Sequence, residues 1–360
     1  MRLLIAGGGT GGHLFPALAV AKALQAEAPG SSILFVGAAQ GIEAQILPNT
    51  EFSVRFISAR GMRRTGLANI ARAAIELPIG IMQSFSIIRE FRPDVILGVG
   101  GYASGPTLAV AVMLRVATAI QEQNSVMGTT NRILYRFVDR IFTSWEETDP
   151  APPSEKTILA GNPVREDLFE AAEVDKTGET FNVLIFGGSG GARSINVAMT
   201  ADLSLLGPLA RRIRVIHQVG AAGIDEIKRA YTDAGIEADV REFIYEMGSA
   251  YRWADLVVSR SGASTLAEIT ALGKPAIVTP YPYAIGDHQA RNARVLESRG
   301  AVRVIRDQDI KNGALISEIR HLAENPAILK NMAENSRRLG RPDAARIIAL
   351  ELLNMKRGRS

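Results

Sequence analysis

The residues from 255 to 292 combine apolar runs with polar groups that could bind a nucleotide. The runs 255–259 and 275–280 are short and bounded by glycine or proline, which is typical of buried parallel strands, and Ser264 to Leu272 has helical periodicity. A helix that starts after a parallel strand points free backbone N–H groups into the crevice beyond the sheet, where they can bind a phosphate. Glu268 lies in the first turns of this helix, where its carboxylate can accept hydrogen bonds from vicinal sugar hydroxyls. The stretch predicts a nucleoside diphosphate site, although an ordinary strand–helix–strand unit with capping serines and a solvated Glu268 has the same pattern.

A second candidate for chemistry is His13, which follows a run of glycines near the start of the chain. Residues 2–6 predict a strand, residues 7–12 a glycine turn and residues 15–26 a helix. The glycines allow positive φ angles and let a ligand come close to the backbone. At the entrance of a helix the dipole disfavours the imidazolium form, so the ring can accept a proton near pH 7. His13 is therefore a candidate general base, and the alternative is a capping or packing histidine.

The same glycine turn formally satisfies the dinucleotide-binding fingerprint through Gly7, Gly9 and Gly12. That fingerprint requires an acidic residue after the second strand to bind the adenosine ribose. The second strand, 33–36, is followed instead by Gly37 and Ala38. A nicotinamide-dependent oxidoreductase is therefore disfavoured.

Two further strand ends in the first half carry turns of the same kind. The strand 95–98 runs into the glycine-rich turn 98–106, and the strand 117–121 closes with Glu122, Gln123 and Asn124. The carboxyl ends of parallel strands meet at one edge of a sheet. These turns are therefore expected to line one crevice.

The predicted fold class is α/β, with two Rossmann-like domains whose parallel sheets face each other across a cleft. Residues 167–179 are polar and poor in strand signals, and the pattern of strand, glycine turn and helix then restarts at 182–186. We expect an N-terminal domain over 1–163 and a C-terminal domain over 164–340. A last helix within 341–356 is expected to cross back to the first domain.

The composition narrows the classes of function. The chain has 360 residues, 47% hydrophobic, and no cysteine, which excludes disulfides and thiolate metal sites and fits a reducing compartment. The first apolar run is too short for a signal peptide, and no window has the roughly 18 uninterrupted apolar residues of a membrane span. Basic and aromatic residues are not interleaved as in single-stranded nucleic-acid binding, so we expect no nucleic-acid partner. No aspartate-rich or histidine cluster indicates a metal.

The segment 67–90 is helical in pattern, broken at Pro78, and rich in apolar residues. Several arginines precede it or lie at its start, among them Arg60, Arg63, Arg64 and Arg72. An apolar patch ringed by arginines fits an anionic lipid surface. The alternative, favoured by periodicity alone, is that these residues pack on the sheet.

Taken in order along the chain, these motifs resemble the MurG-type transferases of bacterial cell-wall synthesis. Each match is weak alone, but together they span almost the whole chain. The matching stretches are residues 7–16, 98–106, 122–124, 162–165, 187–196, 242–244, 260–268 and 287–292. The resemblance implies a GT-B architecture and transfer of N-acetylglucosamine from UDP-GlcNAc to lipid I, giving lipid II for peptidoglycan.

The resemblance also implies roles for individual residues. It assigns the ribose hydroxyls to Glu268, the uracil to the backbone of Ile244, and the sugar ring to Asn124, His288 and Gln289. The full donor-binding set that it implies is Thr10, Gly11, Gly12, Asn124, Arg165, Ser189, Asn196, Ile244, Arg260, Ala263, Glu268, His288 and Gln289. The implied acceptor-binding set is Gly9, Gly101, Tyr102 and Ser104, the membrane-contact set is Ile75, Ile79, Met82 and Phe85, and the catalytic set is His13 with Glu122.

The implied setting is the cytoplasmic face of the bacterial plasma membrane, where the protein would be peripheral. Its partners would be UDP-GlcNAc, lipid I, the anionic membrane surface and a cell-wall synthesis complex, with no cofactor. The chain departs from the family at Gln121, where His-Glu-Gln-Asn is common and this sequence has Gln-Glu-Gln-Asn. Glutamine cannot titrate, so proton transfer at this position is excluded and His13 is the better candidate base.

The expected reaction is a single displacement with inversion, in which the acceptor's C4 hydroxyl attacks the anomeric carbon of UDP-GlcNAc. Two other functions fit the same motifs. A UDP-GlcNAc 2-epimerase would have the same architecture but need no acceptor. A catalytically silent UDP-sugar-binding scaffold would keep the nucleotide residues, and Gln121 is the feature that favours it.

Overall fold

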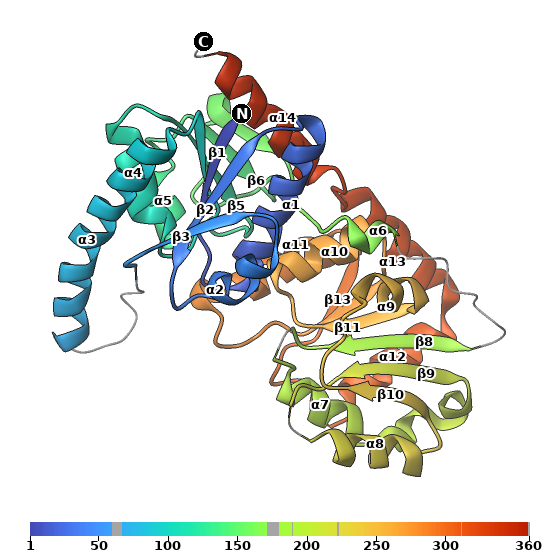
Figure 1. The fold of residues 1–360 in the computed structure, drawn as a ribbon. Helices are drawn as coiled ribbons and strands as arrows, with labels where there is room; N and C mark the ends of the chain where they lie inside the picture. Colours follow the sequence, from blue (N-terminus) through green and yellow to red (C-terminus); the bar gives the residue numbers. More distant parts are fainter. Residues whose placement is uncertain (60–66, 171–179, 189, 222, 311, 359–360) are drawn as a thin grey trace. The chain divides into compact units, whose positions relative to one another are not determined.

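The computed structural model describes residues 1–59, 67–170, 180–188, 190–221, 223–310 and 312–358 (Figure 1). Two residues expected at functional positions fall outside this description, namely Ser189 and the side chain of Ile75. The chain forms two compact units. Unit 1 comprises Met1–Arg165 together with Arg341–Ser360, and unit 2 comprises Glu166–Gly340.

The described part of unit 1 contains a sheet of seven parallel strands in the order β3-β2-β1-β4-β5-β6-β7. Their bounds are β1 (Arg2–Ala6), β2 (Ser32–Ala38), β3 (Ser53–Ile57), β4 (Val95–Gly98), β5 (Ala117–Glu122), β6 (Arg140–Thr143) and β7 (Thr157–Leu159). In this register Ile5 of β1 lies between Phe35 of β2 and Leu97 of β4. The central strands are buried almost throughout because helices cover both faces of the sheet.

Helices from both ends of the chain cover one face of this sheet. Helix α14 (Ala344–Arg357) lies beside α1 (Gly11–Glu27), as Figure 1 shows. Ile348 and Leu352 of α14 join the same buried cluster as Leu14 and Leu24 of α1. Helix α14 is therefore part of unit 1.

The other face of the sheet is covered by α3 (Leu67–Phe91), α4 (Ser104–Met113) and α5 (Thr129–Leu134). Helix α3 continues through Pro78, whereas the sequence indicated a break there. Pro78 is exposed, so water can hydrate the carbonyl group that its missing N–H leaves without a helical partner. The remaining short elements of unit 1 are α2 (Glu43–Ile46), η1 (Leu47–Asn49) and η2 (Ser154–Lys156).

The described part of unit 2 contains a parallel sheet of six strands in the order β10-β9-β8-β11-β12-β13. The strands are β8 (Phe181–Phe186), β9 (Ile213–Gln218), β10 (Glu237–Arg241), β11 (Leu256–Ser259), β12 (Ala276–Val278) and β13 (Val302–Val304). Its helices are α6 (Asp167–Glu170), α7 (Arg193–Thr200), η3 (Leu203–Arg211), α8 (Ile224–Asp233), α9 (Met247–Trp253), α10 (Ala263–Ala271), η4 (Ile285–Asp287), α11 (His288–Ser298), α12 (Ala314–Glu324) and α13 (Pro326–Leu339). The predicted succession of strand, turn, helix and strand after residue 255 is confirmed as β11, α10 and β12. Strand β10 ends at Arg241, and residues 242–246 form a loop.

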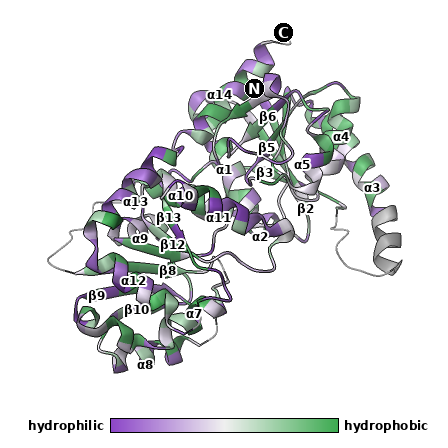
Figure 2. Ribbon diagram, turned by 180° about the vertical axis from the view of Figure 1, so that it is seen from behind, coloured by the Kyte–Doolittle hydropathy of each residue, from purple (hydrophilic) through white to green (hydrophobic). Residues whose placement is uncertain are grey.

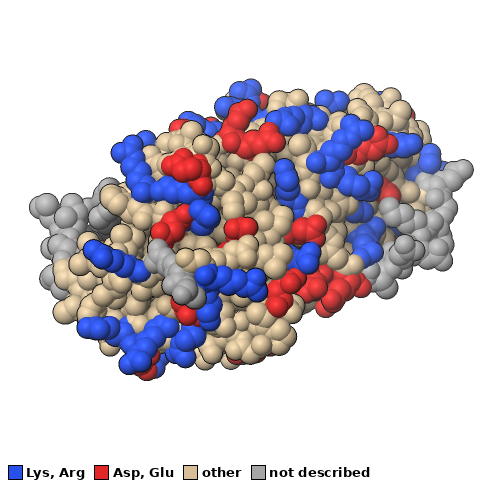
Figure 3. Space-filling view, turned by 90° about the horizontal axis from the view of Figure 1, so that it is seen from above, with Lys and Arg blue, Asp and Glu red and all other residues tan. Residues whose placement is uncertain are grey.

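The surface and interior follow the usual division of polarity. Figure 2 shows that the strands of both sheets are largely hydrophobic, while α11 and α13 carry many hydrophilic residues. On the face visible in Figure 3, lysine and arginine are interspersed with aspartate and glutamate. None of the helices in the described ranges is both long enough and apolar enough to cross a bilayer.

Candidate functional site

The two glycine turns of unit 1 form one cradle at the carboxyl ends of β1 and β4. The Gly8 N–H donates to the Gly100 carbonyl at 3.3 Å. A Cβ atom on Gly7 would lie 2.4 Å from the Gly100 oxygen, and one on Gly101 would lie 2.2 Å from the Gly8 oxygen. The backbones touch so closely that no side chain fits between them. The sequence predicted each turn, and the adjacency of β1 and β4 brings them together.

His13 lies in the first turn of α1, directly against this cradle. Its Nδ1 atom is 3.2 Å from the Gly8 carbonyl oxygen and 3.2 Å from the Thr10 hydroxyl. Because a carbonyl oxygen only accepts hydrogen bonds, the contact with Gly8 assigns the ring hydrogen to Nδ1. The lone pair is then on Nε2, beside Gly100, where a Cβ atom would come within 3.0 Å of Nε2. This is the tautomer that a base acting through Nε2 needs.

The N–H of Gly9 points inward, and not toward the surface where a bound acceptor substrate would lie. It donates to Oε2 of Glu43 at 2.6 Å, and Oε1 of Glu43 accepts from the Ala38 N–H at 2.9 Å. The Glu43 carboxylate is 1% exposed and lies beneath the turn. Sequence reasoning missed Glu43, because only the tertiary structure brings a residue after β2 under the turn after β1. Thr10 and Gly12 are exposed, and Gly11 is half-buried.

Glu122 is a buried residue that shapes the loop after β5. Its Oε1 accepts from the Asn124 N–H at 2.9 Å, and its Oε2 accepts from Gly128 N at 3.0 Å and Asn131 Nδ2 at 2.9 Å. Burial raises the pKa of this carboxyl, against the hydrogen bonds from Asn124, Asn131 and Gly128, which lower it. At 1% exposure the Glu122 side chain is enclosed within unit 1, and its expected catalytic role stays a prediction. Asn124 also donates to Glu122 through Nδ2, at 3.4 Å.

Gln121, at the position where the family commonly has histidine, belongs to a buried chain of amides. Its Nε2 donates to Oδ1 of Asn162 at 3.0 Å, and its Oε1 accepts from Gln123. Gln123 donates in turn to the Val99 carbonyl at 2.9 Å. Because Gln121 is fully buried, its inability to titrate affects the interior of unit 1 and not a surface that meets a substrate.

The other residues expected near the acceptor differ in their accessibility. Tyr102 is 46% exposed, whereas Ser104 is fully buried at the start of α4. A Cβ atom on Gly98 would lie 2.6 Å from the Ser104 hydroxyl oxygen, so this side chain packs against the end of β4. The Gly101 carbonyl accepts from the Thr130 hydroxyl at 3.3 Å. Ser104 is therefore enclosed within unit 1, whereas Tyr102 is accessible, and the expected acceptor contact of Ser104 stays a prediction.

Arg165, expected to contact the nucleotide, is the last residue of the first segment of unit 1. Its guanidinium lies 5.4 Å from the centroid of the Phe15 ring, on the first turns of α1. A guanidinium over an aromatic face is held by electrostatic attraction to the ring. Arg165 is thereby fixed beside the helix that carries His13.

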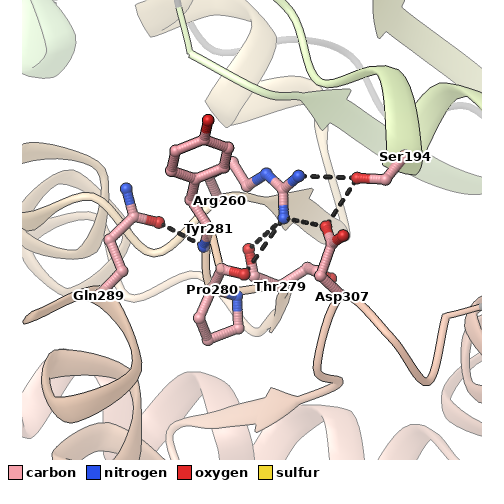
Figure 4. Close-up of polar contacts among 7 residues, drawn as sticks. All are labelled: Ser194, Arg260, Thr279, Pro280, Tyr281, Gln289 and Asp307. Atoms are coloured by element: carbon pink, nitrogen blue, oxygen red, sulfur yellow. Dashed lines mark hydrogen bonds and ion pairs between the residues drawn. The ribbon is translucent and has the colours of Figure 1, made fainter. Parts of the chain in front are cut away.

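In unit 2, Arg260 is the centre of a polar network that joins three segments (Figure 4). Its Nη1 pairs with Asp307 at 2.5 Å and donates to the carbonyls of Thr279 and Pro280, each at 3.2 Å. Its Nη2 donates to the Ser194 hydroxyl at 2.7 Å, and that hydroxyl donates to Asp307 at 2.7 Å. The guanidinium was expected to line the donor site. In the structure its Nη1 and Nη2 groups bind these partners within unit 2.

Asn196 is also turned inward, in a chain of hydrogen bonds with His217 and Tyr231. Asn196 Nδ2 donates to the Val219 carbonyl at 2.8 Å, so its Oδ1 is the acceptor for His217 Nε2 at 3.2 Å. His217 therefore carries its hydrogen on Nε2, and Nδ1 accepts from the Tyr231 hydroxyl at 3.0 Å. Burial lowers the pKa of His217 to about 3 and raises that of Tyr231. This neutral chain fixes α7 to the end of β9.

The start of α10 has the features of an anion site. Its N-cap is Gly262, and no side chain caps the helix, which differs from the capping serines of the alternative interpretation. Ser264 has a buried hydroxyl oxygen without a hydrogen-bond partner among the described residues. Glu268, one turn further on, accepts from the Tyr251 hydroxyl at 2.9 Å, which fixes its carboxylate.

The remaining predicted contacts lie on one loop and at the starts of two helices of unit 2. Ile244 is 2% exposed, so only its backbone could serve a ligand. Gln289 accepts from the Tyr281 N–H at 2.9 Å, and its carbonyl accepts from the Ser261 hydroxyl at 3.0 Å. His288 begins α11, and Ala263 begins α10. In the parts of the chain that the structure describes, no three acidic or histidine side chains cluster as a metal site would require.

Comparison with known proteins gives matches over both units. Residues 3–143 match the glycosyltransferase family 28 N-terminal domain, and residues 182–348 match the glycosyltransferase family 28 C-terminal domain. A protein from Geobacter metallireducens is 45% identical over 99% of this chain and 99% of its own length. One from Geobacter sulfurreducens is 46% identical over 98% of each chain. Both are named UDP-N-acetylglucosamine--N-acetylmuramyl-(pentapeptide) pyrophosphoryl-undecaprenol N-acetylglucosamine transferase.

Solved structures share this fold. The crystal structure of Acinetobacter baumannii MurG has a TM-score of 0.81 and 28% identity, covering 98% of this chain and 99% of that one. A UDP-GlcNAc 2-epimerase from Neisseria meningitidis, solved with UDP-GlcNAc, has a TM-score of 0.68 at 18% identity, covering 98% of this chain and 100% of its own. At that identity the likeness to the epimerase establishes the fold alone.

The buried His217 predicts a specific pH dependence of stability. In the unfolded chain its pKa is near 6.5, whereas the folded protein holds it at about 3, so unfolding takes up a proton between these values. The stability that neutral His217 contributes is complete above pH 6.5 and is lost as the pH falls. We expect His217→Gln to reduce the slope of unfolding free energy against pH between 6 and 4.5 by up to about 1.4 kcal/mol per pH unit.

This slope can be measured by urea unfolding followed by Trp253 fluorescence in a Trp145→Phe background, which reports unit 2. The exposed His321 provides the matched control, because His321→Gln should leave the slope close to that of the parent. An unchanged slope in His217→Gln would show that His217 does not stay neutral in the folded state.

Proposed function

The chain belongs to the MurG family of glycosyltransferases, and on this premise we propose that it transfers N-acetylglucosamine from UDP-GlcNAc to lipid I, forming lipid II. The observation that carries the proposal is the 45% identity, over nearly all of both chains, to a transferase whose name specifies this donor sugar and this acceptor. The reaction adds a β-1,4 bond to the C4 hydroxyl of the acceptor's N-acetylmuramyl group, for peptidoglycan synthesis.

The donor binds to unit 2 at the carboxyl edge of its sheet. The start of α10 lacks a side-chain cap and can direct backbone N–H groups at the diphosphate. Glu268, fixed by Tyr251, accepts from the ribose hydroxyls, and the uracil is bound by the backbone at Ile244. His288, Gln289 and Ala263 complete this edge, and Ser189 keeps its expected role at the phosphates. Arg260 and Asn196 act as positioning residues, because their polar atoms hold the loops that surround the donor.

The acceptor binds to unit 1 at the glycine cradle. Tyr102 is accessible there, and Gly101 and Gly9 shape the backbone against which the pyrophosphate lies. Glu122 holds the loop that carries Asn124, which contacts the transferred sugar. Thr10, Gly11 and Gly12 form the start of α1, and Arg165 beside Phe15 supplies a positive charge near it.

His13 acts as the general base. Its Nδ1 hydrogen is held by the Gly8 carbonyl, so Nε2 takes the proton from the acceptor's C4 hydroxyl as that oxygen attacks the anomeric carbon. The bond from the anomeric carbon to the UDP oxygen breaks on the opposite face, which inverts the configuration. The charge that develops on UDP is met by backbone N–H groups at the start of α10.

Helix α3 provides the contact with the anionic membrane surface, at the cytoplasmic face of the bacterial plasma membrane. Met82 is 64% exposed and Phe85 42%, with the Arg89 guanidinium 5.3 Å from the Phe85 ring centroid. Ile79 is half-buried beside them. Apolar side chains next to arginines combine burial in the lipid interface with attraction to its charge. Association with a cell-wall synthesis complex stays a prediction.

The first test is transfer of labelled N-acetylglucosamine by the purified protein, with and without lipid I. We expect UDP release and label in lipid only when lipid I is present, and His13→Ala should lower kcat by about 10²–10⁴-fold with a smaller effect on KM for UDP-GlcNAc. His321→Ala is the control for loss of an exposed histidine. Turnover of UDP-GlcNAc without acceptor would instead establish an epimerase, and binding without turnover a scaffold.

The ribose contact predicts a change in nucleotide selectivity. Glu268→Ala should weaken UDP binding by about 10- to 100-fold, because a hydrogen bond to a charged group is lost. The variant should also stop distinguishing UDP from 2′-deoxy-UDP, which lacks one of the two hydroxyls. Isothermal titration of both nucleotides measures this, with the exposed Glu226→Ala in the same unit as control. Retained selectivity in Glu268→Ala would move the ribose contact elsewhere.

The membrane contact predicts that binding to anionic vesicles depends on α3. Replacing both Met82 and Phe85 by serine should lower partitioning onto phosphatidylglycerol vesicles by about tenfold or more, because apolar area is removed from the interface. Val197→Ser removes a 58% exposed apolar side chain from unit 2 and should have no effect. Equal flotation of the parent and the double variant would contradict the proposed surface.

A further inference from the structure

We propose that Glu43 is a positioning residue for His13 and acts on it through the peptide group that joins Gly8 to Gly9. The carboxylate is hydrogen-bonded to one end of this peptide group and the imidazole to the other. The inference deepens the proposed function and rests on it only for its meaning in catalysis, since the hydrogen-bonded relay can be tested without any substrate.

Three hydrogen-bonded groups form the relay. Oε2 of Glu43 accepts from the Gly9 N–H at 2.6 Å, and His13 Nδ1 donates to the Gly8 carbonyl oxygen at 3.2 Å. The Gly8 carbonyl and the Gly9 N–H belong to one planar, conjugated peptide group. Two hydrogen bonds therefore connect the carboxylate to the imidazole through this one peptide group.

The Glu43 side chain occupies a space that exists because three surrounding residues are glycines. A Cβ atom on Gly8, Gly37 or Gly41 would come within 2.4, 2.5 and 2.1 Å, respectively, of the Glu43 side chain. The other carboxylate oxygen accepts from the Ala38 N–H at 2.9 Å, and the residue is 1% exposed. A buried carboxylate is costly unless it is hydrogen-bonded, so this arrangement fixes both its position and its orientation.

The carboxylate changes the acceptor strength of the Gly8 carbonyl. A negative charge at the N–H end polarises the peptide and increases the negative charge on its oxygen. A more negative oxygen binds the Nδ1 hydrogen more strongly, and it stabilises the imidazolium that forms when Nε2 takes a proton. Glu43 thereby keeps His13 in the Nδ1–H tautomer and makes Nε2 more basic.

Other polar groups around His13 act from different directions. The Thr10 hydroxyl, at 3.2 Å from Nδ1, is uncharged. The Arg165 guanidinium lies over Phe15 on the same helix and disfavours the imidazolium. These charges stay unchanged when Glu43 is replaced, so the effect of Glu43 can be isolated.

The test is an NMR titration of the histidine rings in the free protein, comparing the parent with Glu43→Gln. We expect the pKa of His13 to fall in the variant by about one unit or more, because the negative charge that favours the imidazolium through the peptide group is removed. His321, exposed in unit 2, serves as the internal reference within each sample. Glu90→Gln, which removes an exposed carboxylate from the same unit, is the matched control and should leave His13 unchanged. An unaltered His13 titration in folded Glu43→Gln overturns the proposal.

A second measurement needs only the parent protein, so it stands even if Glu43→Gln fails to fold. The amide proton of Gly9 should shift with the same midpoint as the His13 ring, because both belong to one hydrogen-bonded chain. A Gly9 amide that does not respond to the His13 titration overturns the relay.

The catalytic meaning of the relay is tested separately in the transfer assay. The acid limb of the kcat/KM profile, which reports the free enzyme, should move to lower pH in Glu43→Gln by the same amount as the NMR titration. A shift by NMR in a protein that transfers no sugar would uphold the relay and overturn the proposed function. Transfer activity whose acid limb stays at the same pH in Glu43→Gln would uphold the proposed function and overturn the relay.

Discussion

Backbone lies directly on backbone at the carboxyl ends of neighbouring parallel strands, and both units of the structure depend on this close approach. In unit 1 a Cβ atom on Gly7 would lie 2.4 Å from the Gly100 carbonyl oxygen. In unit 2 a Cβ atom on Gly191 would lie 2.4 Å from the Val219 oxygen, and one on Gly220 would lie 2.6 Å from the Gly190 oxygen. Glycine is therefore required for packing as well as for the shape of the turn. The same absence of side chains leaves the strand ends open to a ligand, so packing and binding impose one requirement on the sequence.

Most of the polar side chains near these strand ends face inward and support the loops. Glu122 binds the N–H groups of its own loop, Arg260 joins the segments of Ser194, Thr279 and Asp307, and Asn196 is held by His217. Each polar atom that leaves water must find a partner, so a buried network forms one arrangement with little freedom. Loops held in this way keep the few ligand-facing groups in place before any ligand arrives.

The sequence was sufficient to predict much of the fold and the placement of His13, because these depend on local patterns. Short apolar runs bounded by glycine predicted β1, β4, β8 and β11, and the glycine turns marked the strand ends. It could not separate residues that face a ligand from residues that support the loops. Glu122 and Arg260 have the residue types of a functional site, but their direction depends on partners distant in sequence. Glu43 gave no signal at all, since its role comes from the neighbouring position of β1 and β2.

The comparison of His13 with His217 shows why environment, and not residue type, decides which histidine can act as a base. His217 has both ring nitrogens engaged in a fully buried chain, and burial lowers its pKa to about 3, so it stays neutral and rigid. His13 is only half-buried, and a single backbone carbonyl fixes its tautomer through Nδ1. A buried imidazole such as that of His217 stabilises a fold because it does not change its charge. A half-buried imidazole such as that of His13 can accept a proton at Nε2, because its Nδ1 already has a hydrogen-bond partner and water can partly solvate the imidazolium. The glycine cradle provides that difference, since it places the Gly8 carbonyl oxygen at Nδ1 and brings a glycine, Gly100, beside Nε2.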